Sequence, residues 1–117
     1  MTGARSYHAG VAAEEIVARH YQQRGLVLRE QRWRGTAGEV DLIFAEGAGL
    51  VFVEVKASDN FESAAAHLRP RQMERIYAAA SEYLGQMPLG QATESRFDVA
   101  LVDGTGQVEI LEAAFGI

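Results

Sequence analysis

The feature that most constrains the fold is a pair of strongly apolar segments joined by a short turn. Residues 40–45 (VDLIFA) and 50–56 (LVFVEVK) are rich in β-branched and aromatic side chains, and residues 46–49 (EGAG) connect them. This pattern predicts a β-hairpin. The second segment is apolar on both faces until its last residues, which is typical of a strand covered on both sides. We therefore expect the hairpin at the centre of a sheet flanked by helices.

Two helices are predicted from apolar residues that recur at helical spacing. The first runs from about His8 to Arg24, and Gly25 follows where a helix commonly ends. Its apolar residues are Val11, Ala12, Ile16, Val17 and Tyr21. The second begins at Pro70, a favourable first residue of a helix, and ends near Gly85.

Three more strands are predicted around these elements. One covers residues 26–33, and two short ones, residues 96–102 and 107–111, flank a turn at residues 103–106 (DGTG). Residues 57–68 and 86–95 are predicted to be loops, and the apolar tail Ala113-Ala114-Phe115 is expected to dock on the core. The order α-β-β-β-α-β-β favours an α/β fold with a mixed five-stranded sheet flanked by helices.

Length and composition exclude several classes of protein and of functional site. The 117 residues, 48% of them apolar, predict one domain spanning residues 1–117. The chain has no cysteine, which excludes disulfides, thiolate metal sites and cysteine nucleophiles. Its start (MTGARSYH) lacks the apolar stretch of a signal peptide, and no segment is long and apolar enough to span a membrane. We therefore expect a cytoplasmic protein with no membrane partner.

The net charge of −5 argues against a protein that coats nucleic acid through bulk positive charge. The charge is unevenly distributed, however. Residues 1–38 carry six arginines against three acids, whereas residues 39–66 carry one lysine against six acids. The acids therefore gather around the hairpin, between arginine-bearing segments.

Three charged residues of the hairpin form a candidate site. Glu54 and Lys56 are two residues apart on one strand, so both side chains leave the same face. Asp41 begins the partner strand and should approach Glu54 if the two strands are antiparallel. Two carboxylates, with the backbone carbonyl of Val55 as a third oxygen, could hold Mg²⁺ or Mn²⁺. Lys56 could then stabilise negative charge on a phosphate or orient a water molecule.

A plainer interpretation of the same residues is a solvated ion pair between Glu54 and Lys56, worth under about 1 kcal/mol. Repulsion between Asp41 and Glu54 would be costly without a cation, which favours the metal site.

The segments 38–43 (GEVDLI) and 50–56 (LVFVEVK) resemble the core of the YraN-like family of bacterial proteins. That family belongs to the PD-(D/E)XK nuclease superfamily, which includes restriction endonucleases and Holliday-junction resolvases. Further similar segments are residues 15–21, 75–84, 96–99 and 114–115, so the resemblance covers nearly the whole chain. It implies a restriction endonuclease-like core.

The resemblance also implies roles for individual residues. Asp41 and Glu54 would bind the metal, Lys56 would be the catalytic lysine, and Glu15 would complete the site from the first helix. On sequence alone, an exposed acid paired with Arg19 one helical turn away is the favoured interpretation of Glu15, and only the resemblance reverses that order. Glu39 matches an acid of less defined role.

Contacts with nucleic acid are expected from the arginine-bearing segments, namely Arg32, Arg34, Arg69 and Arg71, and from Gln72. Arg32 stands where the pattern leads us to expect asparagine, and Gln72 where we expect lysine, which leaves substrate contacts open. Trp33 could stack on a base, although the sequence favours an ordinary half-buried strand tryptophan between solvated arginines. His8, His20 and His67 lack zinc-ligand spacing, and neither a serine elbow nor a glycine-rich phosphate loop is present.

Two functions remain in view. The first is a metal-dependent endonuclease that hydrolyses phosphodiesters, structure-specific on branched, flapped or single-stranded DNA, with RNA left open as a substrate. The second is a non-catalytic nucleic-acid-binding or adaptor module that retains the nuclease fold. A protein-interaction domain would follow if neither metal nor nucleic acid bound. A homodimer is compatible with the sequence, but no feature demands it.

Overall fold

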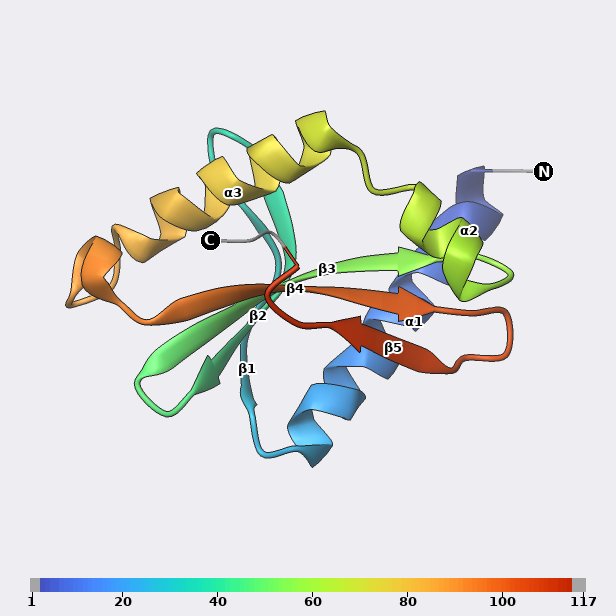
Figure 1. Cartoon of the computed structure of the whole chain (residues 1–117), viewed down its shortest axis with the longest axis horizontal. Coiled ribbons are helices and arrows are strands. Elements are labelled where there is room, and N and C mark those ends of the chain that lie inside the picture. Colours follow the sequence, from blue (N-terminus) through green and yellow to red (C-terminus); the bar gives the residue numbers. More distant parts are fainter. Residues whose placement is uncertain (1–2, 115–117) are drawn as a thin grey trace.

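Five strands form one mixed sheet in the order β1-β2-β3-β4-β5 in the computed structural model (Figure 1). β1 (Val27–Arg34), β2 (Glu39–Glu46) and β3 (Gly49–Ala57) are successively antiparallel. β4 (Ser95–Val102) lies parallel to β3, and β5 (Val108–Leu111) pairs antiparallel with β4. The structure describes the backbone of residues 3–114 and the side chains of residues 12–114. The predicted α/β class and mixed sheet are confirmed, with β3 at the centre.

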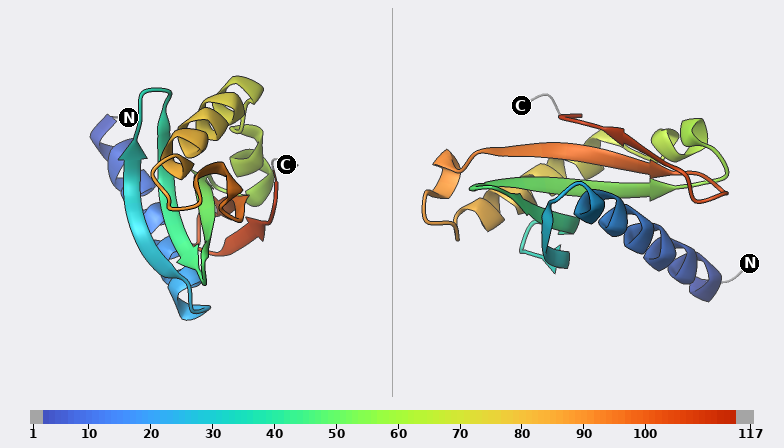
Figure 2. Two further views of the ribbon diagram at one scale, coloured as in Figure 1. Left: turned by 90° about the vertical axis from the view of Figure 1, so that its left-hand side faces the viewer. Right: turned by 90° about the horizontal axis from the view of Figure 1, so that it is seen from below.

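Two long helices cover opposite faces of the sheet (Figures 1 and 2). α1 (Gly3–Gln23) buries Ala13, Val17 and Tyr21 against the alternate residues Leu42, Phe44, Val51 and Val53. α3 (Pro70–Leu84) buries Ile76, Ala79, Ala80 and Tyr83 against Ile43, Leu50, Phe52 and Phe97. Because both faces are covered, β3 is apolar in both directions, as its sequence predicts.

The structure corrects the sequence-based boundaries in two places. α1 begins at Gly3, five residues before the predicted start at His8. A short helix, α2 (Phe61–Ala66), lies where a loop was predicted. Asn60 caps α2 by accepting a 2.7 Å hydrogen bond from the Ser63 N–H, and Ala64 packs against β4. Six residues are too short to show helical periodicity, which explains why the pattern misses this helix. One 3₁₀ turn, η1 (Gly90–Ala92), lies within the predicted loop before β4.

The last described residues lie beside β4. The Ala114 N–H donates to the Phe97 carbonyl at 2.9 Å, while Phe115 of the predicted docking tail and the side chain of Val11 lie outside the described residues. Within the described part of the chain, no helix has the length and apolar character needed to cross a membrane.

The β2–β3 hairpin separates at one end, and this separation positions the candidate site. Its pairing runs from Glu46 opposite Gly49 to Leu42 opposite Val53. Residues before Leu42 and after Val53 therefore lie outside the paired part of the hairpin. The N-terminal part of α1 and the tip of β3 lie at this same end of the molecule (Figures 1 and 2).

Candidate functional site

Asp41 lies where the β2–β3 ladder stops. Its neighbours Val40 and Ile43 both pack in the core on the α3 side, although residues three apart on a regular strand would face opposite sides. The strand is therefore irregular at this level. Asp41 Oδ2 accepts a 2.8 Å hydrogen bond from the Val55 N–H, in place of a ladder partner. The N–H and C=O of one residue point to the same neighbouring strand, so the Val55 carbonyl also faces β2.

Glu54 lies beside Asp41 and is only 4% exposed. The two carboxyl groups are within hydrogen-bonding reach of each other. Lys56 Nζ lies 3.3 Å from Glu54 Oε2, and the Gln72 amide at the start of α3 donates to the same oxygen at 3.0 Å. Asp41, Glu54 and Lys56 therefore lie together, as the sequence predicts. Gln72 of α3 is a fourth side chain at the same place.

Burial and mutual repulsion disfavour the ionised forms of the two acids. Burial and then the charge of Asp41 raise the pKa of Glu54 to about 8, against the lowering effect of Lys56. Burial also raises the pKa of Asp41 above its ordinary value, against the lowering effect of the Val55 N–H. Because the pKa of each acid is raised, the pair binds a proton more readily than two isolated carboxyl groups do.

This donor set fits a hard divalent cation. A cation between two carboxylates removes their repulsion. In the part of the chain that the structure describes, no three acidic or histidine side chains lie close enough together to hold one metal ion. Asp41, Glu54 and the Val55 carbonyl are accordingly the oxygens that could hold it.

Glu15, the predicted contribution of the first helix, does not face this site. Its side chain is exposed, and the preceding Glu14 is turned inward instead. Glu14 Oε1 accepts a 2.9 Å ion-paired hydrogen bond from Arg32 Nε. Burial raises the pKa of Glu14, and Arg32 lowers it while the nearby Asp41 raises it.

A sequence signal for Glu14 did exist. Glu14 lies three, four and seven residues before Val17, Ala18 and Tyr21, all of which are buried. These spacings place Glu14 on the face of α1 that packs on the sheet, whereas Glu15 is rotated by one residue toward solvent.

The arginines predicted to contact nucleic acid lie around this end of the sheet. Arg34 is 79% exposed and pairs with Glu39 at 3.2 Å, and Arg69 and Arg71 are exposed at the start of α3. The loop after β1 is fixed to α3, because the Thr36 N–H donates to the Glu82 carboxylate at 2.8 Å. That contact lies near the C-terminal end of α3, whereas Arg69 and Arg71 lie at its start. Arg32 is engaged by Glu14, and Gln72 by Glu54.

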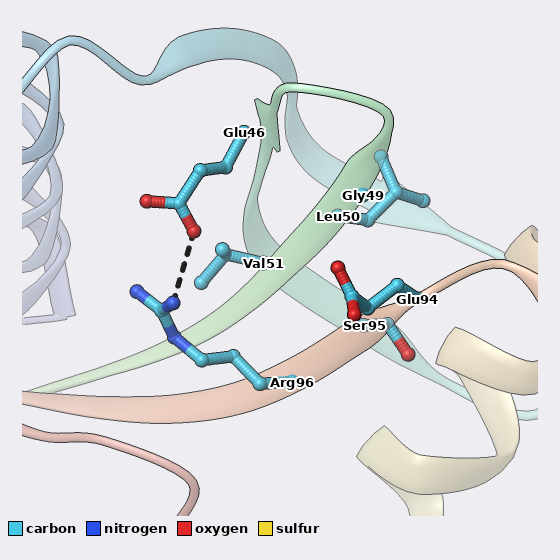
Figure 3. Close-up of a pocket in the computed structure, with 7 residues that line it drawn as sticks. All are labelled: Glu46, Gly49, Leu50, Val51, Glu94, Ser95 and Arg96. Carbon is cyan, nitrogen blue, oxygen red and sulfur yellow. Dashed lines mark hydrogen bonds and ion pairs between the residues drawn. The ribbon is translucent and has the colours of Figure 1, made fainter.

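The opposite end of the sheet holds a cavity of about 190 Å³ (Figure 3). Its lining comes from the β2–β3 turn and the start of β4, namely Glu46, Gly49, Leu50, Val51, Glu94, Ser95 and Arg96. Arg96 Nη1 lies 3.0 Å from Glu46, and its Nε lies 3.1 Å from Asp98. Because acids already neutralise this guanidinium, the cavity is a weaker candidate for binding an anionic substrate than the Asp41–Glu54 end.

Comparison with known proteins identifies the family. Residues 13–102 match the model of the uncharacterised protein family UPF0102. A UPF0102 protein of Cereibacter sphaeroides (strain KD131) is 58% identical over 115 residues, which cover 98% of each chain. A UPF0102 protein of Ruegeria pomeroyi is 56% identical over 114 residues, covering 97% of this chain and 93% of the relative. One from Dinoroseobacter shibae is 44% identical over 109 residues, covering 93% and 81%. The chain belongs to the UPF0102 family.

Proposed function

We propose that this protein is a metal-dependent nuclease that hydrolyses phosphodiester bonds in nucleic acid. The observation that carries the proposal is the buried Asp41–Glu54 pair with Lys56 Nζ 3.3 Å from Glu54. The resemblance of the hairpin to the PD-(D/E)XK nucleases supports it, since that superfamily uses this combination of two acids and a lysine.

Each residue has a definite part in such a reaction. Asp41 and Glu54, with the Val55 carbonyl, would hold Mg²⁺ or Mn²⁺. The Val55 N–H fixes the orientation of Asp41, and the Gln72 amide fixes that of Glu54. When bound, such a cation supplies Lewis-acid activation of water and neutralisation of phosphate charge. Lys56 would stabilise the negative charge that develops on the phosphate in the transition state.

Arginines near the candidate site are the residues that would bind the nucleic acid. Arg34 pairs with Glu39, two residues before Asp41. Arg69 and Arg71 directly precede Gln72, which donates to Glu54, and Arg75 is exposed one turn further along α3. Contacts of this kind hold the phosphate backbone without reading bases. We therefore propose DNA that is branched, flapped or single-stranded as the substrate class, selected by shape.

The test is a cleavage assay on labelled branched, flapped, single-stranded and duplex DNA with Mg²⁺ or Mn²⁺. Asp41→Ala and Lys56→Ala are each expected to lower the rate at least about a hundredfold, because each removes a group that acts on the reacting phosphate. Glu109→Gln is the matched control, since it removes an exposed acid on β5 and should retain the native rate.

Two results would contradict the proposal. Cleavage that survives both Asp41→Ala and Lys56→Ala would assign the activity to a contaminant or to other residues. DNA binding that needs no metal, with no cleavage of any substrate, would favour the non-catalytic nucleic-acid-binding module instead.

A further inference from the structure

Arg32 occupies an unusual place in β1. Its backbone has φ 51°, the left-handed region that residues other than glycine, asparagine and aspartate rarely enter. Glu30 and Trp33 show the consequence, because both contact Tyr83 of α3 although they are three residues apart. The left-handed residue between them shifts the alternation of the strand. Arg32 is thereby turned away from α3 and reaches Glu14 of α1, on the other face of the sheet.

Arg32 of β1 lies opposite Asp41 of β2 in the strand register. The flanking pairs are Gln31 opposite Leu42 and Trp33 opposite Val40, so Arg32 lies across from Asp41 in the register. Both strands are therefore irregular at the level of the carboxylate pair. Backbone strain of this kind persists where neighbouring contacts enforce it and is concentrated at functional sites.

The ion pair with Arg32 compensates the charge of Glu14, which is partly buried near other acids. The Glu14 side chain is only 17% exposed, and Asp41 and Glu39 lie near enough to repel it. A partly buried carboxylate among other carboxylates needs a positive partner. Arg32 supplies one through the 2.9 Å Nε–Oε1 contact. A divalent cation at Asp41 and Glu54 would be a second positive charge beside the same carboxylate.

We propose that Arg32 is a latch on Glu14, and that a divalent cation bound by Asp41 and Glu54 competes with it for that carboxylate. This inference rests on the proposed metal site. Paired with Glu14, the guanidinium neutralises that carboxylate. A cation held by Asp41 and Glu54 would supply positive charge beside Glu14 in place of Arg32, so the Glu14–Arg32 contact would weaken. The guanidinium could then contact the phosphate backbone, as proposed for Arg34, Arg69 and Arg71. Arg32 would thus couple occupancy of the metal site to binding of the nucleic acid.

The first test measures Mn²⁺ binding by calorimetry, without DNA and without turnover. Arg32→Asn removes the guanidinium and keeps a residue that accepts the left-handed backbone. Because the competitor for Glu14 is gone, this variant is expected to bind Mn²⁺ about fivefold more tightly than the native chain. Arg32→Gly, which accepts the same backbone, should behave alike and replaces Arg32→Asn if that variant does not fold.

The control variants separate the latch from bulk charge. Arg24→Asn removes an arginine of the exposed pair with Glu112, at the far end of α1, and should leave Mn²⁺ affinity within about twofold. In a Glu14→Gln background, Arg32→Asn should likewise change the affinity by less than about twofold, because the shared carboxylate is gone.

The outcomes distinguish the two proposals. Native Mn²⁺ binding that is not tightened by Arg32→Asn overturns the latch and leaves the metal site standing. Equal tightening in the native and Glu14→Gln backgrounds also overturns the latch, because Arg32 would then act by charge alone. Absence of Mn²⁺ binding in the native chain overturns both.

A second readout tests the release of Arg32. Binding of fluorescently labelled flapped DNA is measured by anisotropy in a Lys56→Ala background, so that the DNA is not cut. Arg32→Asn should weaken binding about fivefold with Mn²⁺ present and by less than about twofold with a chelator. Equal weakening in both conditions overturns the coupling, since Arg32 would then be available to DNA whether or not metal is bound.

Discussion

Two buried carboxylates on neighbouring strands are held in opposite ways. Asp98 of β4 lies opposite Val53, one residue before Glu54 on β3, and is 0% exposed. It accepts hydrogen bonds from the Tyr21 hydroxyl at 2.7 Å, Arg96 Nε at 3.1 Å and the Ala113 N–H at 3.1 Å.

Glu54, by contrast, faces another carboxylate in addition to Lys56 and the Gln72 amide, and its pKa is raised to about 8. Burial alone therefore does not identify a candidate site in this sheet. The sign of the neighbouring groups does, because donors and a guanidinium make a buried acid structural, whereas a second acid creates a demand for a cation.

The largest expected effect is the loss of Asp98. Asp98→Ala leaves the buried Tyr21 hydroxyl, the Arg96 Nε–H and the Ala113 N–H without their acceptor, so the free energy of unfolding should fall by about 3 kcal/mol or more. Urea denaturation monitored by circular dichroism measures the change. A loss below about 1 kcal/mol would mean that these groups find other partners, and the contrast with Glu54 would fail.

The next effect comes from metal binding. Mn²⁺ at about a hundred times its dissociation constant should raise the free energy of unfolding of the native chain by about 2.7 kcal/mol, because it binds only the folded state. Glu54→Gln should abolish the increase, whereas Glu109→Gln should retain it. An increase that persists in Glu54→Gln would place the cation elsewhere.

A smaller effect of opposite sign to Asp98→Ala is expected when Glu54 is neutralised in the absence of metal. Glu54→Gln keeps an oxygen to accept from Gln72 but removes a charge that is buried beside Asp41. With a chelator present at about pH 8, the free energy of unfolding should rise by about 1 kcal/mol. Denaturation of the two chains side by side measures it, and destabilisation would show that Lys56 compensates the charge of Glu54 in full.

The hairpin and its site could be predicted because they depend on local rules. Strand alternation puts Glu54 and Lys56 on one face, and antiparallel pairing brings Asp41 to the same end. The structure has both features, with Lys56 3.3 Å from Glu54 and Asp41 bonded to the Val55 N–H. The apolar run of β3 likewise predicted its central place.

The features that escaped prediction depend on tertiary packing. The choice between Glu14 and Glu15 turns on a rotation of one residue around α1, which is set by the packing of Val17 and Tyr21 on the sheet. The left-handed backbone of Arg32 has no sequence signal, because arginine is not a residue that favours it. It becomes understandable only once Glu14 is seen across the sheet.

The smallest effect concerns Asp103, an acid surrounded by donors at the β4–β5 turn. Its Oδ1 accepts from the Thr105 hydroxyl at 2.8 Å and from the Thr105 and Gln107 N–H groups at 2.9 Å each, and these bonds hold the pKa of Asp103 below its ordinary value of 3.8. A lowered pKa in the folded state means that the unfolded chain binds the proton more readily. The resulting stability is present above the unfolded pKa and is lost as the pH falls through the folded one.

Asp103→Asn removes this charge-dependent part of the stability. The native chain should therefore be slightly more stable than Asp103→Asn at about pH 6, and the difference should disappear by about pH 2. Urea midpoints of both chains at the two pH values measure it. A difference that grew on acidification would mean that Asp103 resembles Glu54 rather than Asp98, and that donors at the turn do not determine its charge state. The expected pattern makes the rule general in this chain: the neighbours of an acid decide whether its ionised form stabilises the fold or requires a cation.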